Sequence, residues 1–116
     1  MTINNKKIRQ EAKIESEIIK MLSKQGYFVR ALEGKRPQDA GVSDLMCVSS
    51  EGKISFLETK TPDEFDSPTG GLSDNQFNFL VKVQGKIVTL KSGELLFKGT
   101  DDVKKAIFDR MLKKGE

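Results

Sequence analysis

Residues 54–61, which read ISFLETKT, decide the fold of this chain because they lead a strand into a pair of charged side chains. The first four residues are mainly apolar and favour β-structure. Glu58 and Lys60 follow directly. Since strand side chains alternate between two faces, these two charged side chains lie on the same face. The pair is either a solvated strand end or part of a catalytic site.

A second strand is expected at residues 44–48, and the turn sequence SSEGK at 49–53 joins it to the first strand as a hairpin. With these five residues as the loop, the predicted opposite pairs are Val48 with Ile54, Met46 with Phe56, and Asp44 with Glu58. Directly opposed residues have Cβ atoms about 4.5–5.5 Å apart. We therefore expect Asp44, Glu58 and Lys60 to cluster at one end of the hairpin, stacked on an apolar face.

Two carboxylates placed directly opposite each other destabilise a hairpin, so the Asp44–Glu58 pair needs an explanation. One explanation is that both side chains reach into water and that Lys60 screens their repulsion. The other is that a divalent cation lies between them and cancels the repulsion. Mg²⁺ takes octahedral oxygen ligands and keeps several waters, so two carboxylates and a backbone carbonyl are enough to hold it.

The first helix carries a glutamate where a core residue is expected. At 100° per residue, one apolar stripe is formed by Ile8, Ala12, Ile18, Ile19 and Leu22. Glu15 falls near the middle of this stripe, and burying an unpaired carboxylate is costly. Either Glu15 reaches the rim of the core or pairs with a lysine, or it faces a bound cation or a water.

The remaining elements complete one mixed α/β domain over residues 1–116. The expected order is α-β-β-β-α-β-β-α, with helix 6–25, strands 27–32, 44–48 and 54–58, helix 73–85, strands 86–90 and 94–97, and helix 100–114. Ser73 and Gln76 form a capping-box pattern at the start of the second helix, and Gly85 is expected to end it. Residues 1–5 are expected to be frayed, 33–41 to form a polar loop, and 61–72 to form a long, mobile Pro/Gly loop.

The composition excludes several kinds of site. The chain has no histidine and one cysteine, Cys47, which excludes imidazole chemistry and an internal disulfide and argues against a zinc site. We expect Cys47 to be a small core residue. No apolar run approaches the roughly 20 residues that a membrane span needs, and the polar, basic N-terminus lacks the apolar region of a secretory signal.

Three short motifs occur in a fixed order along the chain: GVSDL at 41–45, FLETKTP at 56–62 and LSDNQ at 72–76. Together with Glu15 they resemble the VRR-NUC family of the PD-(D/E)XK nuclease superfamily. That family has a glutamate on the first helix, G-x-x-D at the start of a strand, E-x-K at the end of the next strand, and a glutamine on the following helix. The similarity covers roughly residues 11–90, and the compact length is similar to that of stand-alone members found in phages. The chain departs from the family at Ser43, where many members have proline, and at Thr59, where valine is common.

The resemblance implies a restriction-endonuclease-like fold, with a small mixed sheet flanked by helices, and a Mg²⁺- or Mn²⁺-dependent DNA endonuclease. The implied metal ligands are Asp44, Glu58, the Thr59 carbonyl and Glu15. Lys60 is expected beside the attacking water, where it would lower the pKa of that water or stabilise developing negative charge. Gln76 would hydrogen-bond a phosphate or the hydration shell of the ion, although a plain capping role stays open. The implied catalytic set is Glu15, Asp44, Glu58, Lys60 and Gln76.

DNA is the expected partner, since the chain has 20 Lys and Arg against 17 Asp and Glu, a net charge of +3. The expected phosphate contacts are Arg30, Lys35, Arg36, Lys6 and Lys7, unless these groups are only solvated. No aromatic array for stacking single-stranded bases is visible along the sequence, so we favour duplex or branched DNA, such as a four-way junction. One active site in each small subunit makes a homodimer the simplest way to cut two strands.

Two other functions stay open at this point. One is a DNA-binding module of the same fold without activity, although the presence of every charged motif residue argues against it. The other is a small interaction or regulatory protein in which the acidic cluster is a surface patch. For the nuclease and for both alternatives, a cytoplasmic location is expected, within a bacterial host cell if a phage encodes the chain.

Overall fold

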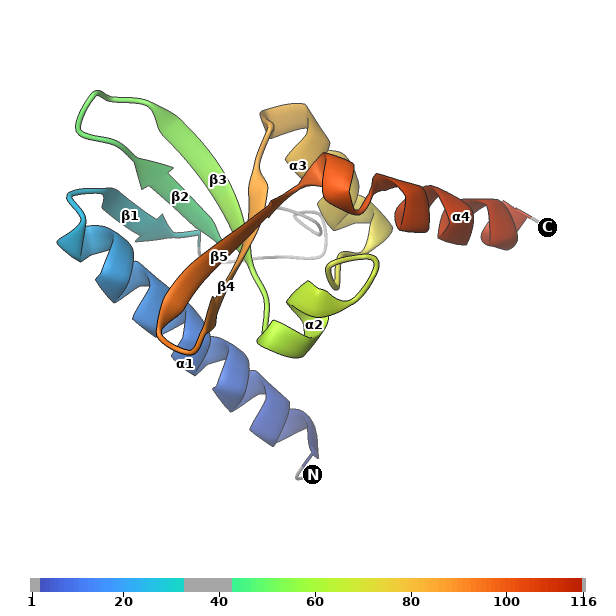
Figure 1. Cartoon of the computed structure of the whole chain (residues 1–116), viewed down its shortest axis with the longest axis horizontal. Coiled ribbons are helices and arrows are strands. Elements are labelled where there is room, and N and C mark those ends of the chain that lie inside the picture. The colour runs from blue at the N-terminus through green and yellow to red at the C-terminus, as the bar shows by residue number, and fades with distance from the viewer. Residues whose placement is uncertain (1–2, 33–42, 116) are drawn as a thin grey trace.

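The computed structural model describes residues 3–32 and 43–115, with side chains described from residue 10 onward. Within these ranges a five-stranded sheet carries helices on both of its faces (Figure 1). The elements are α1 (Ile3–Lys24), β1 (Phe28–Ala31), β2 (Leu45–Val48), β3 (Ile54–Thr59), α2 (Pro62–Asp66), α3 (Asp74–Val83), β4 (Lys86–Lys91), β5 (Glu94–Gly99), a 3-10 turn (Thr100–Asp102) and α4 (Lys104–Gly115). The predicted mixed α/β class is confirmed. The polar loop expected at 33–41 lies outside the described residues.

The sheet has the strand order β1-β2-β3-β4-β5, and its neighbouring strands are antiparallel except for β3 and β4, which are parallel. A parallel pair needs a crossover, and here the crossover contains α2 and α3. Two of the predicted hairpin pairs are confirmed, Val48 with Ile54 and Met46 with Phe56. The ladder between β2 and β3 ends at Leu45 and Leu57, so the third predicted pair, Asp44 with Glu58, lies just beyond the ladder.

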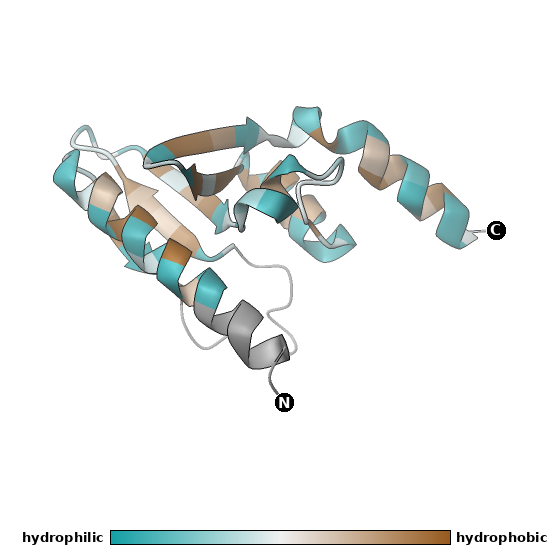
Figure 2. Cartoon of the chain, turned by 60° about the horizontal axis from the view of Figure 1, so that its bottom comes forward, coloured by the Kyte–Doolittle hydropathy of each residue, from teal (hydrophilic) through white to brown (hydrophobic). Residues whose placement is uncertain are grey.

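The two faces of the sheet enter two separate cores, because neighbouring residues of a strand point in opposite directions. On one face, Val88 of β4 packs with Ile18 and Leu22 of α1. On the other face, Ile87 packs with Phe65 of α2, Phe77 and Leu80 of α3, and Ile107 of α4. Cys47 is buried in the α1 core as expected, and burial raises the pKa of its thiol. In Figure 2 the strands are mostly hydrophobic, and α4 extends away from the sheet.

The apolar stripe of α1 has a different phase from the predicted one. Ile18 and Leu22 are buried and Ile14 packs beside them, whereas Ala12, which was placed in the stripe, is exposed. Residues 14, 18 and 22 are spaced by four and therefore share one face of the helix. The side chain of Ile8 lies outside the described residues. None of the helices in the described ranges combines the length and the apolar character that a bilayer span requires.

The loop predicted at 61–72 contains a short helix, α2, so the expectation of an unstructured loop was wrong. Thr61 accepts a hydrogen bond from the backbone of Glu64, and the Glu64 carboxylate accepts one from the backbone of Thr61. This capping box, with Pro62 in the first turn, explains why a helix begins here. At the N-terminus, α1 begins at Ile3, ahead of the predicted start at residue 6, so residues 3–5, expected to be frayed, are helical.

The second long helix, α3, begins as predicted with a capping box between Ser73 and Gln76. Its end differs from the prediction. The residue in the left-handed conformation is Gln84, with φ 54°, and not Gly85. The backbone N–H of Gly85 donates to the carbonyl of Leu80 at 2.8 Å. Gly85 therefore has another reason for being glycine, which is the lack of space beside it.

Candidate functional site

A pocket of about 310 Å³ lies where α1, the start of β2, the end of β3 and the start of α3 meet. Its lining residues are Glu11, Ala12, Glu15, Asp44, Glu58, Thr59, Lys60 and Gln76. All the residues that the sequence predicted as catalytic or metal-binding are among them. The fold therefore gathers side chains that are distant along the chain into one polar pocket.

Thr59 holds Asp44 at the open end of the β2–β3 hairpin, opposite the turn. The Asp44 Oδ2 atom accepts hydrogen bonds from the Thr59 backbone N–H at 3.0 Å and from the Thr59 hydroxyl at 2.8 Å. The Asp44 carbonyl also accepts a hydrogen bond from the backbone of Leu32 at 2.8 Å. Asp44 thus joins the end of β1 to the end of β3, just beyond the last pair of the ladder between β2 and β3.

A chain of hydrogen bonds connects Glu58, Gln76 and Lys60. The Gln76 amide donates to Glu58 Oε2 at 3.2 Å, and Gln76 Oε1 accepts from Lys60 Nζ at 3.4 Å, a long contact. The Glu58 residue is only 2% exposed, so its carboxylate lies deep in the pocket. The same Gln76 oxygen accepts from the backbone of Ser73 at 2.9 Å. The capping role and the site role of Gln76, which the sequence left as alternatives, therefore occur together.

The glutamates of α1 reach the pocket from a face of the helix next to its buried stripe. Glu15 is half-buried and Glu11 is exposed, and both line the pocket with Ala12. Glu11 and Ala12 lie four and three positions before Glu15, so both neighbour Glu15 on the helix surface. Glu15 therefore faces the pocket from the edge of the core, and not from its centre.

The carboxylates of the pocket suit a hard cation, because Mg²⁺ and Mn²⁺ prefer oxygen ligands. Across the described residues, however, no three Asp, Glu, Cys or His side chains are already arranged as a metal-binding group. A site that uses two carboxylates and a main-chain carbonyl, with waters in the other positions, does not need such a group.

The predicted DNA contacts lie mostly outside the described part of the chain. This holds for Lys35 and Arg36 and for the side chains of Lys6 and Lys7. Arg30 is described, and it is exposed on β1 with its guanidinium 5.4 Å from the centre of the Phe28 ring.

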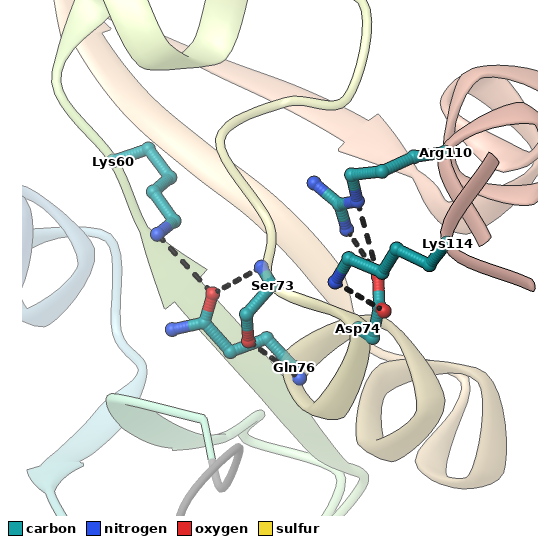
Figure 3. A network of polar contacts seen from close by, with 6 residues as sticks. All are labelled: Lys60, Ser73, Asp74, Gln76, Arg110 and Lys114. Atoms are coloured by element: carbon teal, nitrogen blue, oxygen red, sulfur yellow. Dashed lines mark hydrogen bonds and ion pairs between the residues drawn. The ribbon is translucent and has the colours of Figure 1, made fainter.

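A second polar cluster holds the start of α3 against α4 (Figure 3). Asp74, the first residue of α3, accepts hydrogen bonds from Arg110 Nη2 at 2.6 Å and from Lys114 Nζ at 3.0 Å. The pKa of Asp74 is lowered by the hydrogen bond from Lys114 and by that from Arg110. Because Gln76 lies in the same helical turn, α4 helps to fix the helix end that lines the pocket.

Asp74→Asn is expected to lower the thermal unfolding midpoint at neutral pH by a few degrees. A carboxyl with a depressed pKa in the folded chain stabilises the fold above its ordinary pKa, and this contribution is lost as the pH falls through the folded value. The difference between variant and wild type should therefore shrink in acid, which thermal unfolding followed by circular dichroism across the acidic range will measure. Asp63→Asn, an exposed aspartate in the first turn of α2, is the control. A difference that persists unchanged in strong acid would contradict this role.

Sequence reasoning missed three features of the site. Glu11 and Ala12 were not assigned to it, because the phase of the α1 stripe was misjudged. The hydroxyl of Thr59 was also missed, since only its carbonyl was considered. Spacing by three and four residues from Glu15 was the signal for Glu11 and Ala12, whereas the contact of Thr59 depends on how the hairpin ends.

Comparisons of this chain with protein-family models, with curated proteins and with solved structures give no significant match. The resemblance to the VRR-NUC family therefore stays a prediction.

Proposed function

We propose that this chain is a Mg²⁺- or Mn²⁺-dependent endonuclease that hydrolyses phosphodiester bonds in branched or duplex DNA. One observation carries the proposal: a single pocket is lined by Glu15, Asp44, Glu58, Thr59, Lys60 and Gln76. Carboxylates that can hold a divalent cation, beside an amine that can stabilise negative charge, suit phosphodiester hydrolysis in a chain without histidine. The same ordered residues support the finer proposals of a PD-(D/E)XK fold and of membership in the VRR-NUC family.

The ion would be held by Asp44, Glu58 and the main-chain carbonyl of Thr59, with Glu15 on the opposite wall. All of these are oxygen donors, which is the ligand type of a hard divalent cation. When bound, the ion supplies Lewis-acid polarisation of the phosphoryl oxygens and lowers the pKa of the attacking water.

Lys60 is the only basic side chain that lines the pocket in the described part of the chain. Its backbone N–H donates to the carbonyl of Val88 at 3.0 Å, so the residue continues the alignment of β3 with β4. The Lys60 side chain lines the pocket, where its ammonium group would stabilise the negative charge that develops on the phosphoryl group. The Gln76 amide keeps Lys60 and Glu58 apart at a fixed spacing, since it bonds to both.

Glu15 and the DNA contacts complete the proposal. Glu15 orients the attacking water from the α1 side of the pocket. Arg30 contributes a salt-dependent phosphate contact, and the net charge of +3 favours a polyanion. A symmetric homodimer would bring two such pockets to two strands of a junction.

The test is a cleavage panel with Mg²⁺ or Mn²⁺ on plasmid DNA, a flap, a four-way junction and a single strand. We expect the wild type to cleave at least one of these substrates, and we expect this cleavage to stop when a chelator is added. Lys60→Ala should reduce cleavage by about 10²-fold, the usual effect of removing one group that stabilises transition-state charge.

Lys53→Ala is the matched control, because Lys53 and Lys60 lie just outside the opposite ends of β3 and Lys53 is exposed at the turn. Its activity should equal that of the wild type. Cleavage by Lys60→Ala at the wild-type rate would remove the proposed role of this lysine. Absence of cleavage with either ion on every substrate would overturn the proposed function and favour a catalytically inactive module.

A further inference from the structure

The face of β1, β2 and β3 that points away from α1 carries apolar and basic side chains that the proposed chemistry does not use. Val29, Leu45 and Leu57 belong to the α1 core, so the alternate residues of these strands point to the opposite side. Apart from Glu58, which lines the pocket, these alternate residues are Phe28, Arg30, Met46, Val48, Ile54 and Phe56, which together we name the open face.

Pairing between the strands orders the open face into two rows. The outer row consists of Phe28, Val48 and Ile54, and the inner row of Arg30, Met46 and Phe56. Phe28 is 56% exposed and Ile54 is 55% exposed, so the outer row presents large apolar side chains to water. The inner row is partly covered, because Phe79 of α3 packs edge-on against Phe56 with ring centres 5.9 Å apart.

The next step along the same strands leads into the pocket. Asp44 lies two residues from Met46, and Glu58 two residues from Phe56, so the period of two continues the open face toward the carboxylates. An extended ligand bound across the open face would therefore reach the pocket while still in contact with the sheet.

The chemistry of the open face suits a nucleic-acid strand. Arg30 holds its guanidinium over the Phe28 ring, 5.4 Å from the ring centre, which places a positive charge on one face of an exposed aromatic side chain. Single-stranded nucleic acids are bound by this combination, with bases stacked on aromatic rings and phosphates attracted by nearby cations. Sheets with exposed aromatic residues bind unpaired bases in the same way.

The geometry points to the open face as a binding surface for unpaired nucleobases that adjoin the phosphate in the pocket. This inference rests on the proposed function and narrows its substrate class to DNA with a single-stranded segment next to the cleaved bond. Phe28 would stack against a base, Ile54 would extend the apolar contact surface, and Arg30 would attract a phosphate of the bound strand.

A second copy of the chain fits the open face less well. Burying Arg30 in a protein interface would be costly unless an acidic partner met it. Phe28 and Ile54 each expose about half of their surface, which is small against the roughly 800 Å² per partner of a standard interface.

Base stacking is tested by binding measurements in a chelator, where no cleavage occurs. The probes are a labelled single strand, a strand of equal length and charge in which abasic residues replace the bases, and a duplex. The wild type should bind the normal strand at least about fivefold more tightly than the abasic strand, the lower end of what one stacked base contributes. Phe28→Ala should remove this preference, and Phe28→Trp should restore it.

Phe97→Ala is the matched control, because Phe97 is also an exposed strand phenylalanine, 46% exposed, but lies on the α1 side of the sheet with Val88. It should keep the preference for the normal strand. Ile54→Thr, which keeps a β-branched side chain, should weaken the preference and provides a second variant if Phe28→Ala fails to fold.

Three results would overturn the inference. The first is equal binding of normal and abasic strands by the wild type, and the second is an unchanged preference in Phe28→Ala. The third is that the wild type sediments as a dimer and shows no base preference, while Phe28→Ala sediments as a monomer. The binding measurement tests the stacking surface, and the cleavage measurement tests the proposed function, so the two proposals can be rejected independently. A chain that prefers normal strands but cleaves nothing loses only the proposed function, whereas one that cleaves without base preference loses only the stacking surface.

Discussion

Asp44→Asn is expected to reduce Mg²⁺-dependent cleavage by about 10³-fold, which corresponds to about 4 kcal/mol of lost transition-state stabilisation. The substitution separates the charge of Asp44 from its hydrogen bonds, because the two donors of Thr59 need only a carbonyl oxygen, which asparagine also offers. What the variant loses is the negative charge. A hard cation prefers carboxylate to amide oxygen in a site with so few protein ligands, so binding of the ion should fall together with activity.

Thermal unfolding separates this loss of charge from a loss of structure. Without added metal, Asp44→Asn should still unfold in one cooperative transition, since asparagine can accept both hydrogen bonds from Thr59. Mg²⁺ should raise the unfolding midpoint of the wild type, because a ligand that binds only the folded state stabilises it, and should leave the variant nearly unchanged. Calorimetric titration with Mg²⁺ gives the affinity directly.

The control for Asp44→Asn is Asp109→Asn, which removes an exposed carboxylate on α4 that pairs with Lys105 at 3.2 Å. This control should keep both its activity and its response to Mg²⁺. If Asp44→Asn cleaves at the wild-type rate, Asp44 is not a metal ligand and the pocket has another purpose.

Gly85→Ala should be the most destabilising of the substitutions considered, by about 3 kcal/mol, the upper part of the range for overpacked sites. A Cβ atom at this position would lie 2.7 Å from the main-chain oxygen of Phe56 and 2.6 Å from Leu80 Cδ2. The leucine methyl can rotate away, but the Phe56 oxygen belongs to β3 and cannot. The end of α3 would have to move away from the sheet.

The unfolding midpoint of Gly85→Ala should fall by about 10 °C or more for a domain of this size, measured by thermal or urea unfolding. Gly99→Ala is the control, because no atom lies within 4 Å of the added Cβ and its φ of −85° suits any residue. Equal unfolding midpoints for Gly85→Ala and Gly99→Ala would contradict this prediction, because they would show that α3 can shift without a loss of folding free energy. Because α3 also carries Gln76, loss of activity beyond the loss of folded protein would reveal a displaced pocket wall.

Local patterns predicted much of this fold. The period-two alternation and the five-residue turn predicted the hairpin register at Val48 with Ile54, and the spacing of Ser73 and Gln76 predicted the start of α3. The same local rule, applied to Thr61 and Glu64, would have predicted α2. The phase of the α1 stripe was misjudged because Ala12 is apolar enough to fit either the core or the pocket wall.

The sequence by itself determined which residues carry charge at the strand and helix ends, and it determined the register of β2 on β3, because these depend on residues close together along the chain. Only the tertiary structure decided that β3 runs parallel to β4, that the glutamates of α1 meet the end of β3, and that Gly85 must lack a side chain. These features depend on how distant segments pack, and the space left between two packed elements is not encoded in the spacing of either one. The open face has the same origin, since Phe28 and Phe56 become part of one surface only when β2 pairs between them.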